Sequence, residues 1–412
     1  MRFAALLLTS VLALAADKPG YDEVLRAVQG KGAGAGEIIA SAMGEENLKK
    51  GSAVLTQGGD FLFAVRSTRP VELVVDDGAP VAMTALPGSD LFVYTGEYRT
   101  GTSHNFHYMI GEERFGGKTD VPAFGPYSYE KPGVPKGMLS EKMVHTSKIY
   151  PGMQNDWWIY VPAGYDASKP AAVMVWQDGQ GMVAREGTRA QIVIDNLTHE
   201  GKLPVTIHLF IAPGMVGEKR MRAIEYDTVD DTYVRYLLEE MLPQVAAKYK
   251  IRTDAYSRAI AGNSSGGICA FNAAWQKPGE FSRVLSRIGS FTSIAWRPGE
   301  KDGGNLFPFM IRKLPKRNIR VWLQDGSNDL ENTHGSWPLQ NLQMANSLKM
   351  RGYDFHLSWT NGTHNGAAGN AELPEELLWL WRDYDASKTE QQYAQDPAES
   401  TKPEFRVRSL NR

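Results

Sequence analysis

A serine lies at the centre of the run GNSSG, residues 262–266, which matches the pattern G-x-S-x-G. An apolar stretch at 259–261 precedes the run, and an apolar helical pattern follows it at once. Strand, sharp turn and helix in this order are typical of a nucleophile elbow, which exposes a serine hydroxyl. Ser264, unlike Ser265, lies midway between the two glycines and is the predicted nucleophile. The alternative is a glycine- and serine-rich turn without chemistry.

A serine hydroxyl is a poor nucleophile at neutral pH and needs a base, for which histidine is the usual choice. Three histidines follow Ser264 in the chain. His356 lies within an apolar strand pattern, so we expect it to be structural. His364 lies in a glycine-rich loop, residues 361–366, from which it can reach back to the serine. We predict His364 as the base and keep His334 as the alternative.

The acid of such a triad comes between the serine and the histidine in the chain. A strand pattern at 319–324 ends in the acidic loop DGSNDLE, residues 325–331. Asp325 is close to the strand end and can serve the turn, whereas Asp329 has room to project over the edge of the sheet. We predict Asp329 as the acid, with Glu331 as the alternative. Otherwise, all three carboxylates cap the turn and the following helix.

The developing oxyanion needs two backbone N–H donors. One is the amide of Ser265, which follows the nucleophile, and the other comes from a loop after an earlier strand. A strand pattern at 171–176 runs into QDGQG at 177–181, so Gly179 or Gln180 is the predicted second donor. The alternative for this segment is an ordinary turn.

The composition is that of a globular protein, with 42% hydrophobic residues, 22% charged residues and a net charge of −2. There is no basic stripe, so we expect no nucleic-acid partner. The single cysteine, Cys269, excludes an intrachain disulfide and is expected to be a small core residue. We expect neither a cofactor nor a metal ion, since His104 and His107 fall on opposite faces of a predicted strand.

The length of 412 residues predicts two domains. Residues 1–16 have the pattern of a secretory signal peptide: Arg2, an apolar run at 4–13, and a small-residue cleavage site at 13–15. We therefore expect a secreted or periplasmic protein without a membrane span after cleavage. The alternatives are an uncleaved anchor or a buried helix. Residues 17–50 carry helical patterns and are expected to be a lead-in segment.

Residues 51–137 contain short β-type runs separated by turns, which predicts a small antiparallel sandwich. Residues 138–386 alternate strand and helix patterns, which predicts a mostly parallel sheet covered on both faces. The polar, charged residues 387–412 are expected to be a disordered tail. The expected strands of the larger region are 157–161, 171–176, 206–211, 258–261, 283–288, 319–324 and 355–359, and its expected helices are 189–200, 231–249, 266–275, 339–350 and 375–385.

The region 138–386 resembles the enterochelin-esterase-like branch of the esterase D group of α/β-hydrolases, to which carbohydrate esterase family 1 is related. The resemblance is carried by VMVWQDG at 173–179, RAIEYD at 222–227, EEMLP at 239–243, the elbow, QDGSND at 324–329 and GTH at 362–364. It implies the α/β-hydrolase fold, a preceding immunoglobulin-like early-set domain, and the roles proposed for Ser264, His364 and Asp329. The chain departs from the family at Ser265, where relatives often carry a larger residue.

Four further residues are candidates for substrate binding. The resemblance places Arg222 and Glu225 near the pocket, and the alternative for them is a structural ion pair below the site. Trp296 and Trp337 lie in predicted loops and could stack on a sugar or a phenolic acyl group.

These features predict a secreted serine esterase that forms an acyl-enzyme. The resemblance suggests acetyl or feruloyl esters of plant polysaccharide as substrates. The basic features of siderophore esterases are not evident, which argues against an iron-siderophore substrate. One alternative is a glycan-binding protein with a vestigial hydrolase domain. Another is a serine peptidase or acyltransferase, because acyl transfer to water, amine or alcohol uses the same groups.

Overall fold

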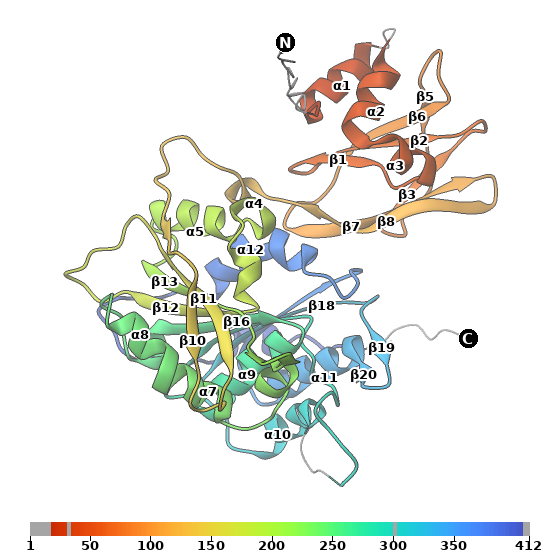
Figure 1. Cartoon of the computed structure of the whole chain (residues 1–412). Helices are drawn as coiled ribbons and strands as arrows, with labels where there is room; N and C mark the ends of the chain where they lie inside the picture. Colours follow the sequence, from red (N-terminus) through yellow and green to blue (C-terminus); the bar gives the residue numbers. More distant parts are fainter. Residues whose placement is uncertain (1–17, 31–33, 300–302, 407–412) are drawn as a thin grey trace, which may run out of the picture. The chain divides into compact units, whose positions relative to one another are not determined.

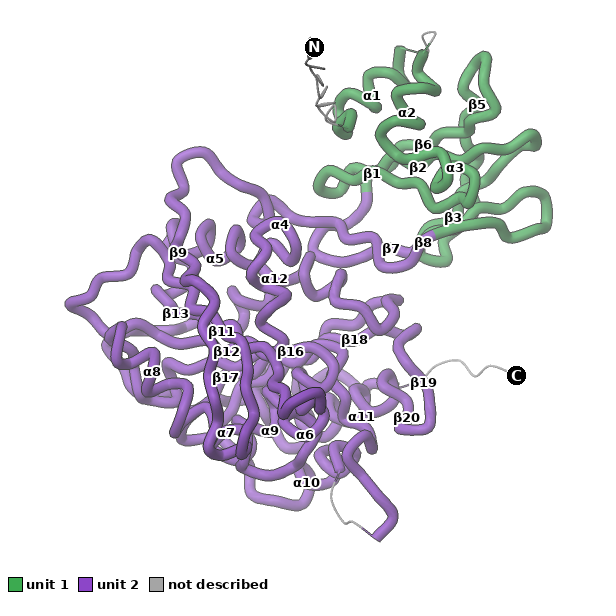
Figure 2. Tube along the Cα trace, viewed as in Figure 1, with its two compact units in different colours: residues 1–97, 106–117 green, residues 98–105, 118–412 purple. Residues whose placement is uncertain are grey.

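The computed structural model describes residues 18–30, 34–299 and 303–406, so the predicted signal peptide lies outside the described residues. The chain divides into two units (Figures 1 and 2). One contains residues 1–97 and 106–117, and the other contains residues 98–105 and 118–412. No described helix combines the length and the apolar character needed to cross a membrane.

Two antiparallel sheets, with the strand orders β1-β2-β6-β5 and β4-β3-β7-β8, form the body of the N-terminal unit, and β7 and β8 continue into residues 102–105 and 118–123 of the other unit. Their strands are β1 (Val54–Gln57), β2 (Asp60–Arg66), β3 (Glu72–Val75), β4 (Val81–Ala82), β5 (Thr84–Ala85), β6 (Leu91–Glu97), β7 (Thr102–Ile110) and β8 (Glu113–Ala123). Phe63 of β2 meets Phe106 of β7 edge to face, with ring centroids 4.9 Å apart. The two sheets therefore share a core, as a sandwich does.

The described residues between 18 and 50 form more than the lead-in segment that we expected for residues 17–50. They form α1 (Tyr21–Gly30), α2 (Ala35–Met43) and α3 (Glu45–Lys50). Each helix buries an apolar residue, Val24, Ile39 and Leu48, in one cluster with Leu62 of β2 and Leu91 of β6. These helices are part of the N-terminal unit because their apolar faces complete its core.

The larger unit is built on one sheet with the strand order β15-β14-β11-β13-β12-β16-β17-β18-β21, and β9 and β10 pair with β11. Neighbours from β13 to β21 are parallel, and β11 is antiparallel to β13. The strands are β9 (Met138–Leu139), β10 (Met143–Thr146), β11 (Gln154–Val161), β12 (Ala172–Gln177), β13 (Thr206–Ile211), β14 (Met215–Val216), β15 (Lys219–Arg220), β16 (Arg258–Asn263), β17 (Arg283–Arg287), β18 (Arg320–Gly326) and β21 (Asp354–Thr360).

Helices cover both faces of this sheet (Figure 1). Val173 and Val175 of β12 point into one core, whereas Met174 and Trp176 point into the other. Strands buried on both faces are continuous apolar runs, which is why the sequence revealed them. The α/β-hydrolase fold class is confirmed. The helices are α4 (Arg185–Thr188), α5 (Ala190–His199), α6 (Arg222–Tyr226), α7 (Thr232–Tyr236), α8 (Leu242–Ala246), α9 (Ser265–Gln276), α10 (Phe307–Lys313), α11 (Trp337–Met350), α12 (Ala367–Leu380) and α13 (Pro397–Ser400).

The disordered tail expected for 387–412 is wrong for residues 387–406. Tyr393 is buried, and its hydroxyl lies 3.1 Å from Ser282 Oγ. Phe405 packs edge to face on Phe355 of β21, with centroids 6.4 Å apart. A few aromatic anchors thus hold a mostly polar segment against the unit. Residues 407–412 lie outside the described residues.

Candidate active site

Ser264 lies at the turn between β16 and α9, with φ 59° and ψ −123°. This backbone conformation is costly for a residue with a side chain, and the surrounding structure must hold it. The Ser264 amide donates to the Arg287 carbonyl over 2.9 Å, which ties the turn to β17. A Cβ on Gly262 would lie 2.4 Å from the Gly266 carbonyl carbon. Gly262 is therefore a glycine because a side chain there would overlap the Gly266 backbone, whereas a Cβ on Gly266 would lie 3.1 Å from Gln177 Cβ.

The structure brings Ser264, His364 and Asp329 together past the carboxyl ends of β16, β21 and β18. His364 Nε2 lies 2.8 Å from Ser264 Oγ, and His364 Nδ1 lies 2.6 Å from Asp329 Oδ1. A carboxylate only accepts, so Nδ1 carries the proton and Nε2 accepts from the serine hydroxyl. This is the arrangement that a general base needs to take the proton from a nucleophile.

The three candidate carboxylates occupy different places. Asp329 contacts His364, whereas Glu331 is exposed in the short strand β19 (Glu331–Asn332). Asp325 is fully buried, and its Oδ1 accepts from the Gly326 amide over 2.8 Å. Burial, and then the neighbouring Asp329 carboxylate, raise the pKa of Asp325 well above its usual range. Although burial opposes it, hydrogen bonds from His364 and Asp325 lower the pKa of Asp329. Asp325 thus holds a proton beside an ionised Asp329.

The two other histidines that follow Ser264 lie elsewhere. His334 is exposed in the turn between β19 and β20 (Gly335–Ser336), and its carbonyl accepts from the Ser293 amide over 2.9 Å. His356 lies in β21 and stacks on Trp322, with ring centroids 4.0 Å apart. Among the described residues, His364 is therefore the histidine placed to serve as base.

The predicted oxyanion donors lie at the same edge of the sheet. Ser265 is the first residue of α9, where helix amides have no acceptor within the helix. Gly179 and Gln180 begin the 3₁₀ turn Gly179–Met182 directly after β12, the parallel neighbour of β16. Gly179 is buried against β13, where a Cβ would lie 2.2 Å from the Ile211 amide nitrogen. Gln180, by contrast, is exposed.

Arg222 of α6 pairs with Asp178, not with Glu225. Its Nε and Nη2 lie 2.8 and 2.7 Å from the two Asp178 oxygens, and Nη2 lies 3.4 Å from the Asn263 carbonyl. Glu225 is buried and accepts from the Gly214 amide over 2.8 Å. The alternative for these two residues, an ion pair between them, is therefore wrong, because Arg222 pairs with Asp178. Arg222 instead links the segment before Gly179 to the residue before Ser264.

The two candidate tryptophans differ in exposure. Trp296 is 43% exposed, as a residue that stacks on substrate requires. Trp337 is 2% exposed and begins α11, so its expected place in a loop is wrong. Its ring meets the His364 ring nearly edge to face, with centroids 5.6 Å apart. The Trp337 ring therefore packs against the His364 imidazole and restricts its orientation.

Two residues at the site carried no local sequence signal. Ser290 Oγ lies 3.2 Å from Ser264 Oγ. Asp120 Oδ1 accepts from the Thr363 amide over 3.0 Å, and Asp120 Oδ2 accepts from the Thr363 hydroxyl. Both contacts join segments far apart in sequence, and an alignment showing that these positions vary together could have revealed them.

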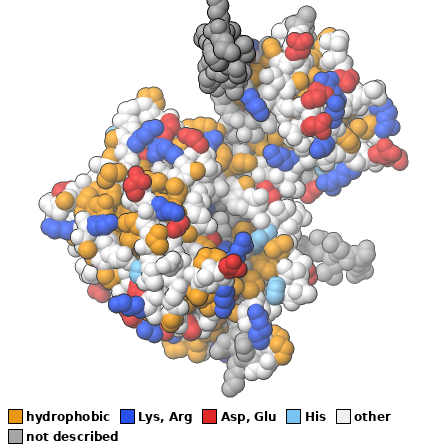
Figure 3. Space-filling view, viewed as in Figure 1, with side chains coloured by type: hydrophobic (Ala, Val, Ile, Leu, Met, Phe, Trp, Pro, Cys, Tyr) orange, Lys and Arg blue, Asp and Glu red, His pale blue; other side chains and the backbone are white. Residues whose placement is uncertain are grey.

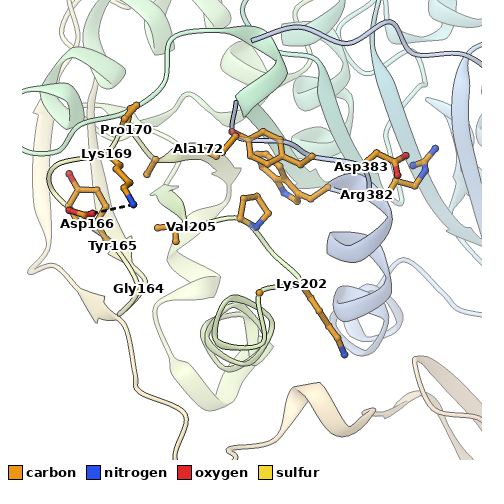
Figure 4. Close-up of a pocket in the computed structure, with 16 residues that line it drawn as sticks. Gly164, Tyr165, Asp166, Lys169, Pro170, Ala172, Lys202, Val205, Arg382 and Asp383 are labelled. Carbon is orange, nitrogen blue, oxygen red and sulfur yellow. Dashed lines mark ion pairs between the residues drawn. The ribbon is translucent and has the colours of Figure 1, made fainter. Parts of the chain in front are cut away.

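A cavity of about 580 Å³ lies at the opposite edge of the sheet, by the amino ends of β12 and β13 (Figure 4). Its basic side chains have acidic partners: Lys169 lies 3.8 Å from Asp166, and Lys202 lies 2.9 Å from Glu200. The cavity therefore lies away from Ser264. The ammonium groups of Lys169 and Lys202 at its rim are each paired with a carboxylate. The described residues contain no cluster of three His, Cys, Asp or Glu side chains that could hold a metal ion.

Residues 152–380, more than half of the chain, match the model of the family described as "Putative esterase". Curated relatives include the iron(III) enterobactin esterases of Dickeya dadantii, 26% identical over 241 residues, and Escherichia coli K12, 25% identical over 231 residues. These alignments cover 54% and 55% of this chain and 51% and 53% of the relatives, so the chain spans about half their length. The ferric enterobactin esterase structure from Salmonella typhimurium is 17% identical, with a TM-score of 0.53, and the match covers 81% of this chain and 97% of that one.

Proposed function

The chain belongs to this esterase family, and from that premise we propose that it is a carboxylic ester hydrolase whose catalytic triad is Ser264, His364 and Asp329. The resemblance to enterochelin-esterase-like hydrolases is confirmed by the family match. The observation that carries the triad is its continuous set of hydrogen bonds, from Ser264 Oγ through His364 to Asp329. An intact set also favours an active enzyme over a vestigial one.

In the proposed reaction, Ser264 Oγ attacks the ester carbonyl and passes its proton to His364 Nε2. Asp329 holds the imidazole in the required tautomer and stabilises the imidazolium. The amides of Ser265 and Gly179 donate to the carbonyl oxygen as it becomes negative, with Gln180 as the alternative second donor. His364 then protonates the leaving alcohol. In the second half of the reaction, water, activated by His364, releases the acyl group.

A fluorophosphonate probe tests the nucleophile, because it forms a stable bond only with an activated serine. We expect the wild-type protein to gain one probe mass at Ser264, and the Ser264→Ala variant to gain none. Ser265→Ala is the matched control and should still be labelled, since its contribution is a backbone amide. Equal labelling of the wild type and Ser264→Ala would overturn the assignment.

For the substrate, we propose an acetyl or feruloyl ester of plant polysaccharide. Three apolar side chains of this unit are exposed: Ile224, two residues after Arg222, Leu330, which follows Asp329, and Trp296 are 38%, 39% and 43% exposed. Hydrophobic and charged side chains are interspersed on the face shown in Figure 3. Surfaces of this kind suit an aromatic acyl group. Arg222 is neutralised by Asp178, which leaves it unsuited to an anionic ferric catecholate.

A substrate panel separates these possibilities. We expect turnover of p-nitrophenyl acetate and of a feruloylated xylo-oligosaccharide to exceed turnover of iron(III) enterobactin, the compound for which the curated relatives are named. Ser264→Ala supplies the background rate for each compound. Hydrolysis of iron(III) enterobactin alone would contradict the plant-ester proposal and leave the triad standing. Replacing the acyl ester with the matching amide tests the peptidase alternative.

We also propose that the protein is exported, on the pattern of residues 1–16 alone. Expression of the full chain in a bacterial host, followed by mass measurement of the periplasmic product, tests this. A mass that begins at Ala16 or Asp17 supports export with cleavage. An uncut chain in the cytoplasm contradicts it.

A further inference from the structure

Ser290 lies three residues beyond the end of β17 and is 1% exposed. Its Oγ lies 3.2 Å from Ser264 Oγ, and its amide donates to the Ser264 carbonyl over 3.1 Å. The Ser264 amide in turn donates to the Arg287 carbonyl. Backbone bonds on both sides of Ser264 therefore hold the Ser290 hydroxyl against the nucleophile.

The surrounding partners decide which hydroxyl donates. An indole N–H only donates, so Ser290 Oγ accepts from Trp337 Nε1, 3.1 Å away. The Ser264 hydroxyl donates its own hydrogen bond to His364 Nε2. The Ser290 proton is then the one available between the two hydroxyls, and it points to Ser264 Oγ. The hydrogen bonds run in one direction, from Trp337 through Ser290 and Ser264 to His364.

We propose that Ser290 is a catalytic residue of the esterase site, whose hydroxyl donates to the oxygen of the nucleophile. This inference rests on the proposed function, in which Ser264 attacks the ester. The hydrogen bond holds Ser264 Oγ in the rotamer that also reaches His364. It also stabilises the partial negative charge that develops on Ser264 Oγ while its proton moves to or from the imidazole and its bond to the carbonyl carbon is only partly formed.

That charge arises twice in each turnover. In acylation, the bond from Ser264 Oγ to the carbonyl carbon forms as its proton passes to His364 Nε2. In deacylation, water adds to the carbonyl carbon and gives a proton to His364. The bond from carbon to Ser264 Oγ then breaks, and the same proton returns to that oxygen. Ser290 keeps its own proton throughout and acts as a fixed donor.

Trp337 is the positioning residue of this arrangement. Its ring packs against His364, and its Nε1–H fixes the Ser290 hydroxyl. The Trp337 amide donates to the Leu330 carbonyl over 3.0 Å, which attaches the start of α11 to the residue after Asp329. One buried indole thus orients both groups that contact Ser264 Oγ.

The test measures the rate of phosphonylation by a fluorophosphonate and the acylation and deacylation rates with p-nitrophenyl acetate. Ser290→Ala should slow each step about three- to tenfold, the usual range for losing one hydrogen bond. Ser286→Ala is the matched control, because Ser286 is a fully buried serine on β17 whose Oγ has no hydrogen-bond partner among the described residues. Its rates should equal those of the wild type, and thermal unfolding of both variants checks the fold.

Trp337→Phe keeps an aromatic ring and removes the donor, so its rate loss should disappear in the Ser290→Ala background. Equal rates for Ser290→Ala and the wild type would overturn the role of Ser290 and leave the triad intact. Independent, additive rate losses from Ser290→Ala and Trp337→Phe would show that the hydrogen bonds of Trp337 and Ser290 do not act in series. Failure of the wild type to be labelled at Ser264 would overturn the proposed function, and this inference with it.

Discussion

Asp325 and Asp329 place two buried carboxyl groups together at the end of β18, and Asp329 is the one that contacts His364. Two carboxylates cannot both be ionised so close together at low cost, so one keeps its proton. The imidazole stabilises the charge on Asp329, and the proton stays on Asp325.

This arrangement predicts unequal effects of removing each carboxylate. Asp329→Asn should lower kcat on the order of a thousandfold or more, because an amide can stabilise the wrong histidine tautomer. Asp325→Asn should stay within about tenfold of the wild type, since an amide N–H can replace the acid proton as donor to Asp329. Glu331→Gln, on exposed β19, is the control and should match the wild type in steady-state assays. A larger loss for Glu331→Gln than for Asp329→Asn would reverse the assignment of the acid.

A second prediction concerns pH and stability. Glu225 is 1% exposed, and burial raises its pKa to about 7, despite the hydrogen bond from the Gly214 amide. The folded protein therefore retains a proton that the unfolded chain releases from its usual value of 4.5 upwards. The free energy of unfolding should fall as the pH rises from about 4.5 to 7. Burial also raises the pKa of Asp227, to about 6, which adds a loss of the same sign.

Urea unfolding at pH 5 and pH 8 measures how much of the pH dependence of the free energy of unfolding comes from Glu225. Between these values the wild type should lose about 2 kcal/mol more stability than Glu225→Gln, which does not titrate. Glu239→Gln removes an exposed carboxylate from the π-helical segment Leu237–Met241, which follows α7, so it should retain the wild-type pH dependence. The prediction fails if Glu225→Gln and the wild type lose stability equally.

The Arg222–Asp178 pair predicts a loss of turnover from a change outside the triad. Asp178 has φ 54°, which asparagine tolerates, so Asp178→Asn keeps the backbone and removes the charge. Without the two-pronged contact, the segment that carries Gly179 is less firmly held. We expect kcat to fall about ten- to hundredfold with a smaller change in KM.

Arg222→Lys should have a similar effect, because an ammonium cannot make both contacts of the guanidinium. Arg235→Lys alters an exposed pair with Glu239, and its kcat should be that of the wild type. If Asp178→Asn raised KM and left kcat unchanged, the pair would bind substrate and would not support the oxyanion donors.

The features that could be predicted from the sequence are those marked by their immediate neighbours in the chain. The strands of the larger unit were visible because burial on both faces makes each a continuous apolar run. Ser264, Asp329 and His364 could be proposed as a triad because the α/β-hydrolase fold gives a nucleophile, an acid and a histidine a known order in the chain. The helix expected at 339–350 begins two residues earlier, at Trp337, and contains Pro338 in its first turn. Proline is compatible with the first turn of a helix, which lacks amide acceptors in any case.

The parts that were missed depend on contacts across the chain. Strand β8 alternates exposed and half-buried residues around two glycines, so its apolar signal is weak. Residues 387–406 are mostly polar, and their order comes from Tyr393 and Phe405. Ser290 lies in a short turn 26 residues beyond Ser264, and its neighbours in sequence do not mark it as part of the site.

Asp120 provides the last prediction, because it holds the loop that carries His364, the proposed base. It accepts from both the amide and the hydroxyl of Thr363, next to His364. Asn105 accepts from the Asp120 amide and donates to the Asn361 carbonyl over 2.7 Å, so both sides of the loop are held. Asp120→Asn tolerates the local φ of 55° and replaces one acceptor with a donor facing Thr363. We expect kcat to fall about tenfold and stability to fall by about 1–3 kcal/mol. Thr363→Ser retains both donors and is the control for kcat and for urea unfolding. A stability loss in Asp120→Asn with unchanged kcat would show that the contact supports the fold but does not position His364.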